Sequence, residues 1–267
     1  MLRRWEKCST YYQRAIAYFE QAKSGPEHRL GLYSRLIVSL SKLKKNDELL
    51  EVKDAATKLI KSIPKKSQTI NLYDHYLALM SNYIDYQVRA VNIKDALSAS
   101  NESLQLGKNY FSPQVFLMHY FNRSLIFIFS SDYRKALYCT NKILSKEKTG
   151  VRQDIISLTK ILSLVIHYEL GNEDMLPNLC KSYSRYFKNH MQEDKLKNVL
   201  LDFFGKTIYK NIDKPLRTKE FIKFKKELEL YKTEQLFVHF DFISWVESKI
   251  ENRPFVDIVK DKKLKNK

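Results

Sequence analysis

The sequence predicts an all-α fold: a right-handed solenoid of antiparallel helix hairpins that ends in a C-terminal packing helix. Three observations favour this class. The 267 residues include only 6 Gly and 6 Pro, too few for the many tight turns of an all-β chain of this length. Apolar residues recur at three- and four-residue spacing along most of the chain. The helical patterns themselves repeat at a period of about 40 residues, as stacked hairpins do.

Composition indicates a chain that buries a substantial core in a reducing compartment. Hydrophobic residues make up 44% of the sequence, and no run approaches the roughly 18 apolar residues of a membrane span. The N-terminal residues lack the apolar segment of a secretory signal. Cys8, Cys139 and Cys180 are odd in number and far apart, which fits neither a disulfide framework nor a zinc site. We therefore expect a cytoplasmic protein without a membrane span.

The formal net charge of +17 raises the question of an anionic partner. Of the 47 basic residues 35 are Lys, whereas bidentate phosphate contacts and base readout favour Arg. A general lysine bias and a dedicated nucleic-acid surface both remain open on this evidence.

The N-terminal part of the chain shows five helical patterns. The first, at residues 3–23, ends at Ser24-Gly25-Pro26, where Gly suits a helix end and Pro cannot continue a helix. The second spans residues 28–43, and the third follows Asp47, which we expect to cap it. The fourth and fifth span residues 69–89 and 93–106, with Asn92 placed to cap the fifth.

Residues 113–145 form the clearest hairpin, in which Ser130-Ser131-Asp132 interrupts two helical patterns. The next hairpin spans residues 152–188 and turns at Gly171-Asn172. Further helices are expected at residues 192–209, 218–231 and 234–250. We therefore predict hairpin repeats over residues 1–190, a helical cap of the same solenoid over 191–256, and a basic flexible tail over 257–267.

The second helices of three hairpins share a register. Ala96-Leu97, Ala136-Leu137 and Leu176-Pro177 occupy equivalent positions, since 136 − 96 = 40 and 176 − 136 = 40. One hairpin cannot bury its apolar face alone, so neighbouring hairpins are expected to complete a continuous core.

One hairpin resembles the tetratricopeptide repeat family. Its aromatic, Asn, small and Asp-Tyr positions match that family's pattern, although Arg123 replaces an apolar residue and the period exceeds the family's ~34 residues. The matching residues are Tyr120, Asn122, Ser124, Phe127, Asp132, Tyr133 and Ala136. The end segment FDFISWVESKIENRPF also resembles the close of long helical-repeat proteins of Bacteroidota-type bacteria. The first resemblance, over residues 1–190, implies a tetratricopeptide-like scaffold.

In that family the first helix of each hairpin lines a concave groove, so the resemblance implies which side chains contact a peptide. The candidates are Asn82, Asp85, Arg89, Phe121, Asn122, Leu125, Phe129 and Tyr168. Asn82 and Asn122 lie one period apart (122 − 82 = 40), and their amides could bind a peptide backbone or connect neighbouring helices.

The apolar groove candidates require a cover, because soluble proteins rarely expose a large apolar patch without a partner. The cover is either a ligand or the protein's own C-terminal region, whose candidate packing residues are Phe237, Phe240, Phe242, Ile243, Trp245 and Ile250.

The first helix resembles the second helix of a hairpin without its mate. We expect an incomplete repeat, a chain that is part of something longer, or a homodimer through this helix with Trp5 at the interface.

No catalytic signature is present: the sequence has no Gly-rich phosphate loop, no G-x-S-x-G elbow and no H-E-x-x-H. Its six histidines never pair at helical spacing, so no metal or cofactor is expected. We predict a non-enzymatic scaffold that binds a protein partner, as a peptide or helix, in a concave groove.

The alternative is a sequence-indifferent nucleic-acid-binding protein that uses its basic C-terminal face. Residues 206–232 carry nine Lys/Arg against four Asp/Glu, with Phe221, Phe224 and Tyr231 interleaved. The same aromatic residues share one helical face, which is also typical of a buried core.

Overall fold

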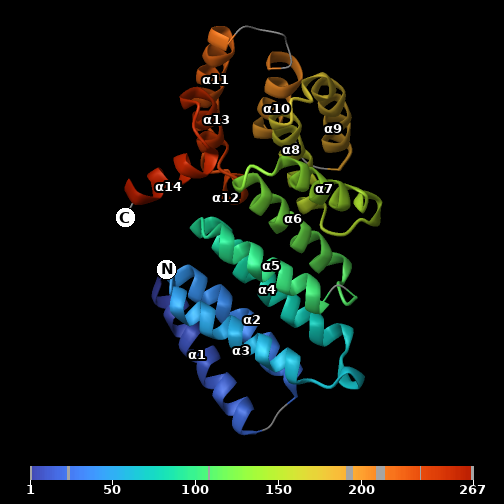
Figure 1. Ribbon diagram of the computed structural model, residues 1–267, viewed down its shortest axis with the longest axis vertical. Coiled ribbons are helices and arrows are strands. Elements are labelled where there is room, and N and C mark those ends of the chain that lie inside the picture. Colours follow the sequence, from blue (N-terminus) through green and yellow to red (C-terminus); the bar gives the residue numbers. More distant parts are fainter. Residues whose placement is uncertain are drawn as a thin grey trace. The chain divides into compact units, whose positions relative to one another are not determined.

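The computed structural model describes residues 2–22, 25–107, 109–190, 195–208, 214–234 and 236–265. All regular structure in these ranges is helical, with fourteen α-helices, which confirms the all-α class (Figure 1). The chain divides into two compact units, unit 1 (Met1–Arg123) and unit 2 (Ser124–Lys267), and the division falls inside α6 (Pro113–Phe129).

Unit 1 is built around two long helices, α2 (Pro26–Leu43) and α4 (Ile70–Ala90), which pack against each other. The helices α1 (Leu2–Gln21) and α3 (Asn46–Ser62) also pack on α2, and α5 (Ile93–Gly107) packs on α4 (Figure 1). The core consists of apolar side chains at three- and four-residue spacing, such as Leu36, Ile37, Leu40, Tyr76 and Met80, all of which are buried.

Local capping explains where several helices begin. The Thr69 hydroxyl accepts the backbone N–H of Leu72 at 3.2 Å and so caps α4 at the predicted boundary. The predicted cap at Asp47 is wrong, because Lys45 is the N-cap of α3 and Asp47 lies in its first turn. A carboxylate in the first turn still stabilises the helix through the positive end of its dipole.

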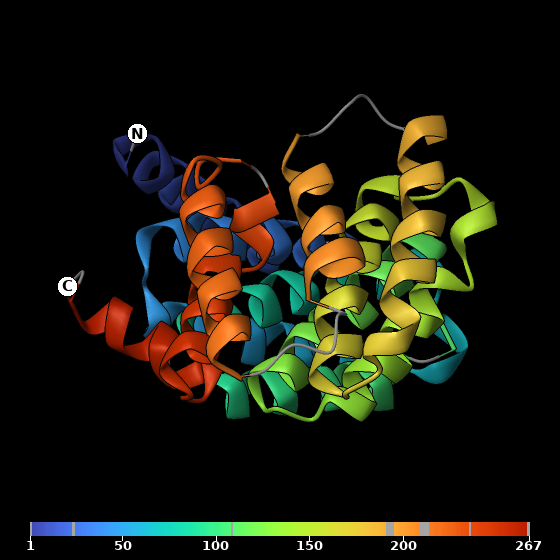
Figure 2. The ribbon, with the colours of Figure 1, turned by 90° about the horizontal axis from the view of Figure 1, so that it is seen from above.

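Unit 2 contains the C-terminal part of α6 and eight further helices. They are α7 (Tyr133–Leu144), α8 (Gln153–Glu169), α9 (Leu176–His190), α10 (Lys195–Asp202), α11 (Lys214–Glu229), α12 (Leu236–His239), α13 (Phe242–Glu251) and α14 (Phe255–Lys265). Buried residues lie on all sides of α8, which packs between α7 and α9. Helices α9, α10 and α11 lie side by side and run roughly parallel in Figure 2, and α13 packs against both α11 and α14.

Two predictions for the C-terminal region are wrong. The expected helix over residues 234–250 is two helices, because Asp241 starts α13 by accepting the backbone N–H of Ser244 at 2.9 Å. The expected flexible tail over residues 257–267 is helical as far as Lys265, within α14. Phe255, Ile258 and Val259 are buried on one face of α14, which provides the apolar contact that its lysines alone cannot supply.

The turns that end α4, α6 and α8 share one geometry. Val91, Ser131 and Gly171 have left-handed φ values of 66°, 56° and 74°. In each turn the next residue donates its backbone N–H to the carbonyl five positions earlier, at 2.9 Å, as helix-ending αL motifs do. These turns lie 40 residues apart, since 131 − 91 = 40 and 171 − 131 = 40.

Candidate functional site

Three of the predicted groove residues are buried. Phe121, Asn122 and Leu125 of α6 expose 4%, 2% and 3% of their surface. The Asn122 amide donates to the backbone carbonyl of Ser81 in α4 at 2.9 Å. Of the two roles considered for this amide, the structure therefore shows the connection between helices, and Asn122 offers no group to a peptide in this conformation.

Two other groove candidates, Phe129 and Tyr168, contact aromatic residues of the C-terminal helices. The ring of Phe129 lies 4.7 Å from that of Phe255, centroid to centroid. The ring of Tyr168 makes edge contacts with Phe221 and Trp245 at 5.8 and 5.7 Å. The chain's own C-terminal region therefore covers these two side chains, as one of the two predicted alternatives required. Trp245 was among the expected covering residues, whereas Phe255 was not.

The remaining candidates lie on α4 and reach solvent. Asp85 and Arg89 form an ion pair one helical turn apart, and Asn82 is partly exposed. An exposed pair of this kind contributes only about 0.3–0.5 kcal/mol, so it serves the helix surface more than the fold.

A hollow of about 420 Å³ in unit 2 brings Tyr168 together with cationic residues that the sequence did not single out. It lies among the end of α8, the start of α11 and the end of α13. Its lining consists of Tyr168, Arg217, Thr218, Phe221, Ser248, Lys249, Asn252, Arg253 and Pro254. Three of these nine residues are cations and none is acidic. We call this site the basic hollow.

Carboxylates behind the lining hold two of the cations in place. Glu173 accepts two hydrogen bonds from the Arg217 guanidinium, at 2.6 and 3.2 Å, and these raise the pKa of Arg217 above its usual value. Glu169 forms an ion pair with Lys249. Two-point pairing between a guanidinium and a carboxylate fixes orientation as well as position, so Arg217 is preorganised in the hollow.

Glu169 also ties the hollow to the core of unit 2. Its side chain is only 10% exposed, and it accepts the indole N–H of Trp245 at 2.6 Å. Burial, together with the negative charge of Glu169, raises the pKa of Tyr133 to about 12, so the phenol stays protonated. One carboxylate thus connects residues of α7, α8 and α13.

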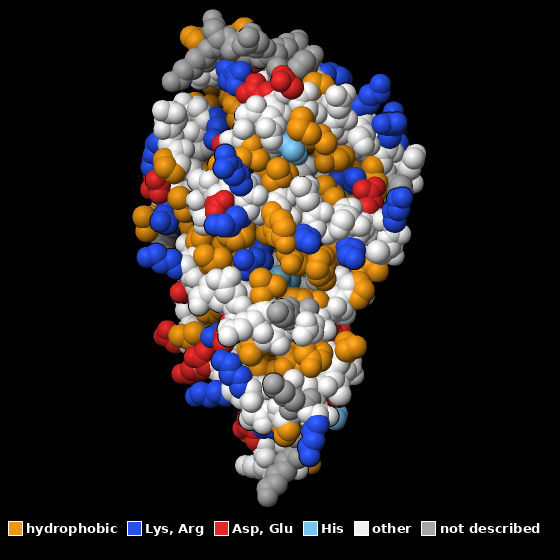
Figure 3. Space-filling model, turned by 45° about the vertical axis from the view of Figure 1, so that its right-hand side comes forward, with side chains coloured by type: hydrophobic (Ala, Val, Ile, Leu, Met, Phe, Trp, Pro, Cys, Tyr) orange, Lys and Arg blue, Asp and Glu red, His pale blue; other side chains and the backbone are white. Residues whose placement is uncertain are grey.

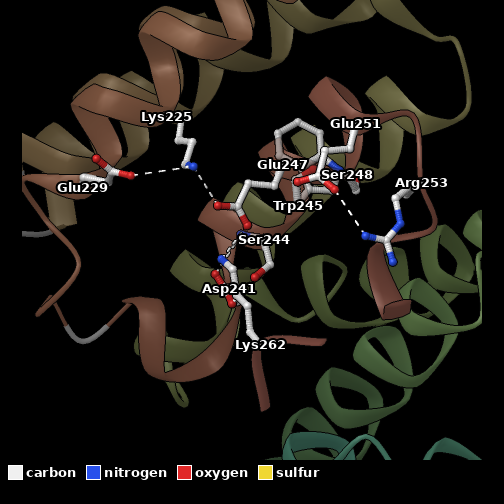
Figure 4. A network of polar contacts seen from close by, with 10 residues as sticks. All are labelled: Lys225, Glu229, Asp241, Ser244, Trp245, Glu247, Ser248, Glu251, Arg253 and Lys262. Carbon is white, nitrogen blue, oxygen red and sulfur yellow. Dashed lines mark hydrogen bonds and ion pairs between the residues drawn. The ribbon is translucent and has the colours of Figure 1, made fainter. Parts of the chain in front are cut away.

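The third cation, Arg253, bridges the ends of α13 and α14. Its guanidinium donates to Asp261 at 2.7 Å and to Glu251 at 3.3 Å, the second of which Figure 4 shows. The hydrogen bond to Asp261 is the main cause of the raised pKa of Arg253. Arg253 remains solvent-exposed, and at this position it can reach a ligand in the hollow.

Glu247 on α13 anchors the neighbouring helices (Figure 4). It pairs with Lys225 of α11 at 2.8 Å and with Lys262 of α14 at 2.5 Å, and its pKa is lowered by these two cations against the opposing effect of burial. Long-range ion pairs of this kind explain why the lysine-rich end of the chain is held in a helix.

The basic stretch at residues 206–232 does not present its aromatic side chains to solvent. Phe221 and Phe224 are each 2% exposed, and Phe224 stacks on Phe203 with ring centroids 3.7 Å apart. On the face drawn in Figure 3, Lys and Arg side chains are scattered among polar and apolar ones and do not form a continuous stripe. Bases therefore find no exposed phenylalanine to stack on in this stretch.

Metal-binding and membrane-spanning features are absent from the described part of the chain. No three His, Cys, Asp or Glu side chains gather there as metal ligands would. None of the helices described is both long and apolar enough to cross a bilayer.

Comparison of the chain with protein-family models, with curated proteins and with solved structures finds no match. The basic hollow was missed at the sequence level because its cations come from separate helices and follow no local spacing. Only Tyr168 belongs both to the predicted groove and to this hollow.

Proposed function

We propose that this protein is a non-enzymatic interaction scaffold, a tetratricopeptide-like α-solenoid whose basic hollow binds an acidic segment of a partner protein. The observation that carries this proposal is the lining of the hollow, where Arg217, Lys249 and Arg253 converge without a carboxylate among them. Its volume of about 420 Å³ suits a few side chains of a peptide.

The preorganisation of the cations supports binding of carboxylates. A guanidinium carries five N–H donors, and Glu173 uses two contacts of the Arg217 guanidinium. Donors that remain can bind a ligand carboxylate without first being ordered, so less conformational entropy is lost on binding. The net charge of +17 would also speed the approach of an acidic partner.

The recurrence of one turn geometry supports the solenoid part of the proposal. Val91, Ser131 and Gly171 end three successive long helices at a spacing of 40 residues. A stacked array of hairpins requires equivalent turns at a fixed period, and a chain of unrelated helices does not.

A peptide-binding measurement tests the function directly. A fluorescent peptide with several Glu residues is titrated with the full chain, and binding is followed by anisotropy at low and high salt. We expect Arg253→Gln and Arg217→Gln each to weaken binding about fivefold or more, since a hydrogen bond to a charged group contributes about 1.5–3 kcal/mol.

The matched control is Lys223→Gln. Lys223 is an exposed cation of α11 that pairs with Glu220 at 2.7 Å and does not line the hollow. Equal effects of all three substitutions would show that the peptide responds to net charge alone. Unchanged binding in Arg253→Gln and Arg217→Gln would exclude the hollow as the binding site.

A further inference from the structure

The outer face of α1 carries a stripe of alternating cationic and aromatic side chains. The five residues are Arg3, Lys7, Tyr11, Arg14 and Tyr18, all exposed. Their spacing of four, four, three and four residues matches the 3.6-residue turn, so the five side chains fall within an arc of about 80° on one side of the helix. We call this surface the α1 stripe.

The opposite side of α1 packs on α2. Ser9 and Ile16 are buried there, Phe19 stacks on His28 with ring centroids 5.7 Å apart, and Glu20 accepts the Tyr33 hydroxyl at 2.9 Å. The acidic residue at the end of α1 is therefore engaged toward α2 and does not neutralise the stripe.

The cations of the α1 stripe have no partner of opposite charge. Among the residues that the structure describes, no ion pair involves Arg3, Lys7 or Arg14, whereas the cations of the basic hollow are all paired. Tyr11 and Tyr18 are 67% and 66% exposed, which is unusual for aromatic side chains. Glu6 is the one acidic residue beside this surface.

We propose that the α1 stripe binds single-stranded nucleic acid, with bases stacked on Tyr11 and Tyr18 and phosphates held by Arg3, Lys7 and Arg14. Exposed aromatic rings beside unpaired cations are what sequence-indifferent single-strand binding requires. This is a different surface from residues 206–232, whose phenylalanines are buried.

The spacing of the stripe fits a short strand. Tyr11 and Tyr18 are seven residues apart, which is about 10.5 Å along a helix, or roughly three times the 3.4 Å rise per base of one strand. From Arg3 to Tyr18 the stripe extends about 22 Å, enough for about six or seven nucleotides, within the range of known single-strand sites.

Charge argues against a second copy of this chain on the same face. A symmetric dimer through α1 would bring the Arg3, Lys7 and Arg14 of both copies together, in a chain whose net charge is already +17. An acidic protein would satisfy the cations, but its carboxylates would leave the two tyrosine rings without a stacking partner.

Binding of a labelled oligothymidylate of about 12 nucleotides to the full chain tests the proposal by fluorescence anisotropy. Three phosphate contacts predict a salt slope of about −2.1, so affinity should fall roughly 18-fold when salt rises from about 50 to about 200 mM. Tyr11→Ala and Tyr18→Ala should each lose about tenfold in affinity at unchanged salt slope. Arg14→Gln should reduce the slope by about 0.7.

Tyr138→Ala is the matched control. Tyr138 is 57% exposed on α7, with the Lys142 ammonium 5.4 Å from its ring centroid, so it removes an exposed tyrosine beside a cation elsewhere on the chain. Affinity should stay within about twofold of the wild type in this variant. Circular dichroism of each variant confirms that α1 remains folded.

Three results would overturn the proposal: no binding at low salt, equal affinity for a duplex of the same length, or full affinity in the Tyr11→Ala/Tyr18→Ala double variant. Competition by a polyglutamate peptide that is also insensitive to both tyrosines would assign the stripe to acidic proteins instead. None of these results bears on the basic hollow, because the α1 variants leave its residues intact.

Discussion

The indole N–H of Trp245 donates to the Glu169 carboxylate at 2.6 Å, across 76 residues of sequence. Trp245 is fully buried, so the bond lies at the centre of unit 2. The same carboxylate pairs with Lys249, which lines the basic hollow. The position of one hollow cation is thus determined by a hydrogen bond in the core.

Trp245→Phe should destabilise unit 2. The substitution keeps a large aromatic side chain but removes the donor, and a buried carboxylate oxygen left without its hydrogen bond costs about 1–3 kcal/mol. Urea denaturation followed by circular dichroism measures this free energy of unfolding. Trp5→Phe is the matched control, because Trp5 is only half-buried on α1, and it should change stability by less than about 0.5 kcal/mol. Equal losses in the two variants would contradict the special role of Trp245.

Asn122→Ala should reduce stability without changing peptide affinity. The substitution removes the 2.9 Å hydrogen bond to the Ser81 carbonyl and is expected to cost about 1–2 kcal/mol. Asn82→Ala alters the equivalent position one period earlier, where the side chain is partly exposed, and should stay within about 0.5 kcal/mol of the wild type. A weaker peptide affinity in Asn122→Ala at unchanged stability would instead return this amide to the binding site.

His119 should make unit 1 less stable at acidic pH. The imidazole is 1% exposed, and burial, with a smaller effect from the Arg123 charge, lowers its pKa to about 3, against 6.5 for an ordinary His. Between these two values the unfolded chain binds more protons than the folded one. The stability due to neutral His119 is therefore complete above pH 6.5 and is lost progressively as pH falls toward about 3, by up to ~1.4 kcal/mol per pH unit.

Denaturation at several pH values between about 5 and 7 tests the role of His119. His119→Leu should flatten the dependence of unfolding free energy on pH relative to the wild type, since it removes the titrating group. Asn122→Ala, which is destabilised but keeps the imidazole, should retain the wild-type slope. A wild-type slope in His119→Leu would show that other groups cause the acid sensitivity.

The helices and their turns were predictable from sequence because they depend on local features. Asp132 illustrates this: its carboxylate accepts the backbone N–H of Lys135 at 3.2 Å and caps α7, three residues from a turn that the sequence marks clearly. The helical tail was not predictable, because it depends on the contact between Lys262 and Glu247, 15 residues earlier on another helix.

The candidate site was still less accessible to sequence analysis. Arg217 and Lys249 occupy different helices, and their positions depend on Glu173 and Glu169, which lie more than 40 residues away in the chain. Spacing rules describe one helix at a time, so they identified Tyr168 but could not bring these cations beside it.

Gly205 should be intolerant of even the smallest side chain. It lies in the π-helical turn Phe203–Thr207 that follows α10, and a Cβ built there would approach the Cβ of Cys180 in α9 to 2.9 Å. A Cβ cannot rotate away, so Gly205→Ala should separate α9 from this turn and cost about 1–3 kcal/mol through overpacking. Gly31→Ala is the matched control, because a Cβ at Gly31 of α2 meets only the His75 ring at 3.7 Å, an ordinary contact. Alanine at a helix interior is favoured over glycine by up to about 1 kcal/mol, so Gly31→Ala should raise the melting temperature while Gly205→Ala lowers it. A stabilised Gly205→Ala variant would mean that the close approach of α9 to this turn is not needed for folding.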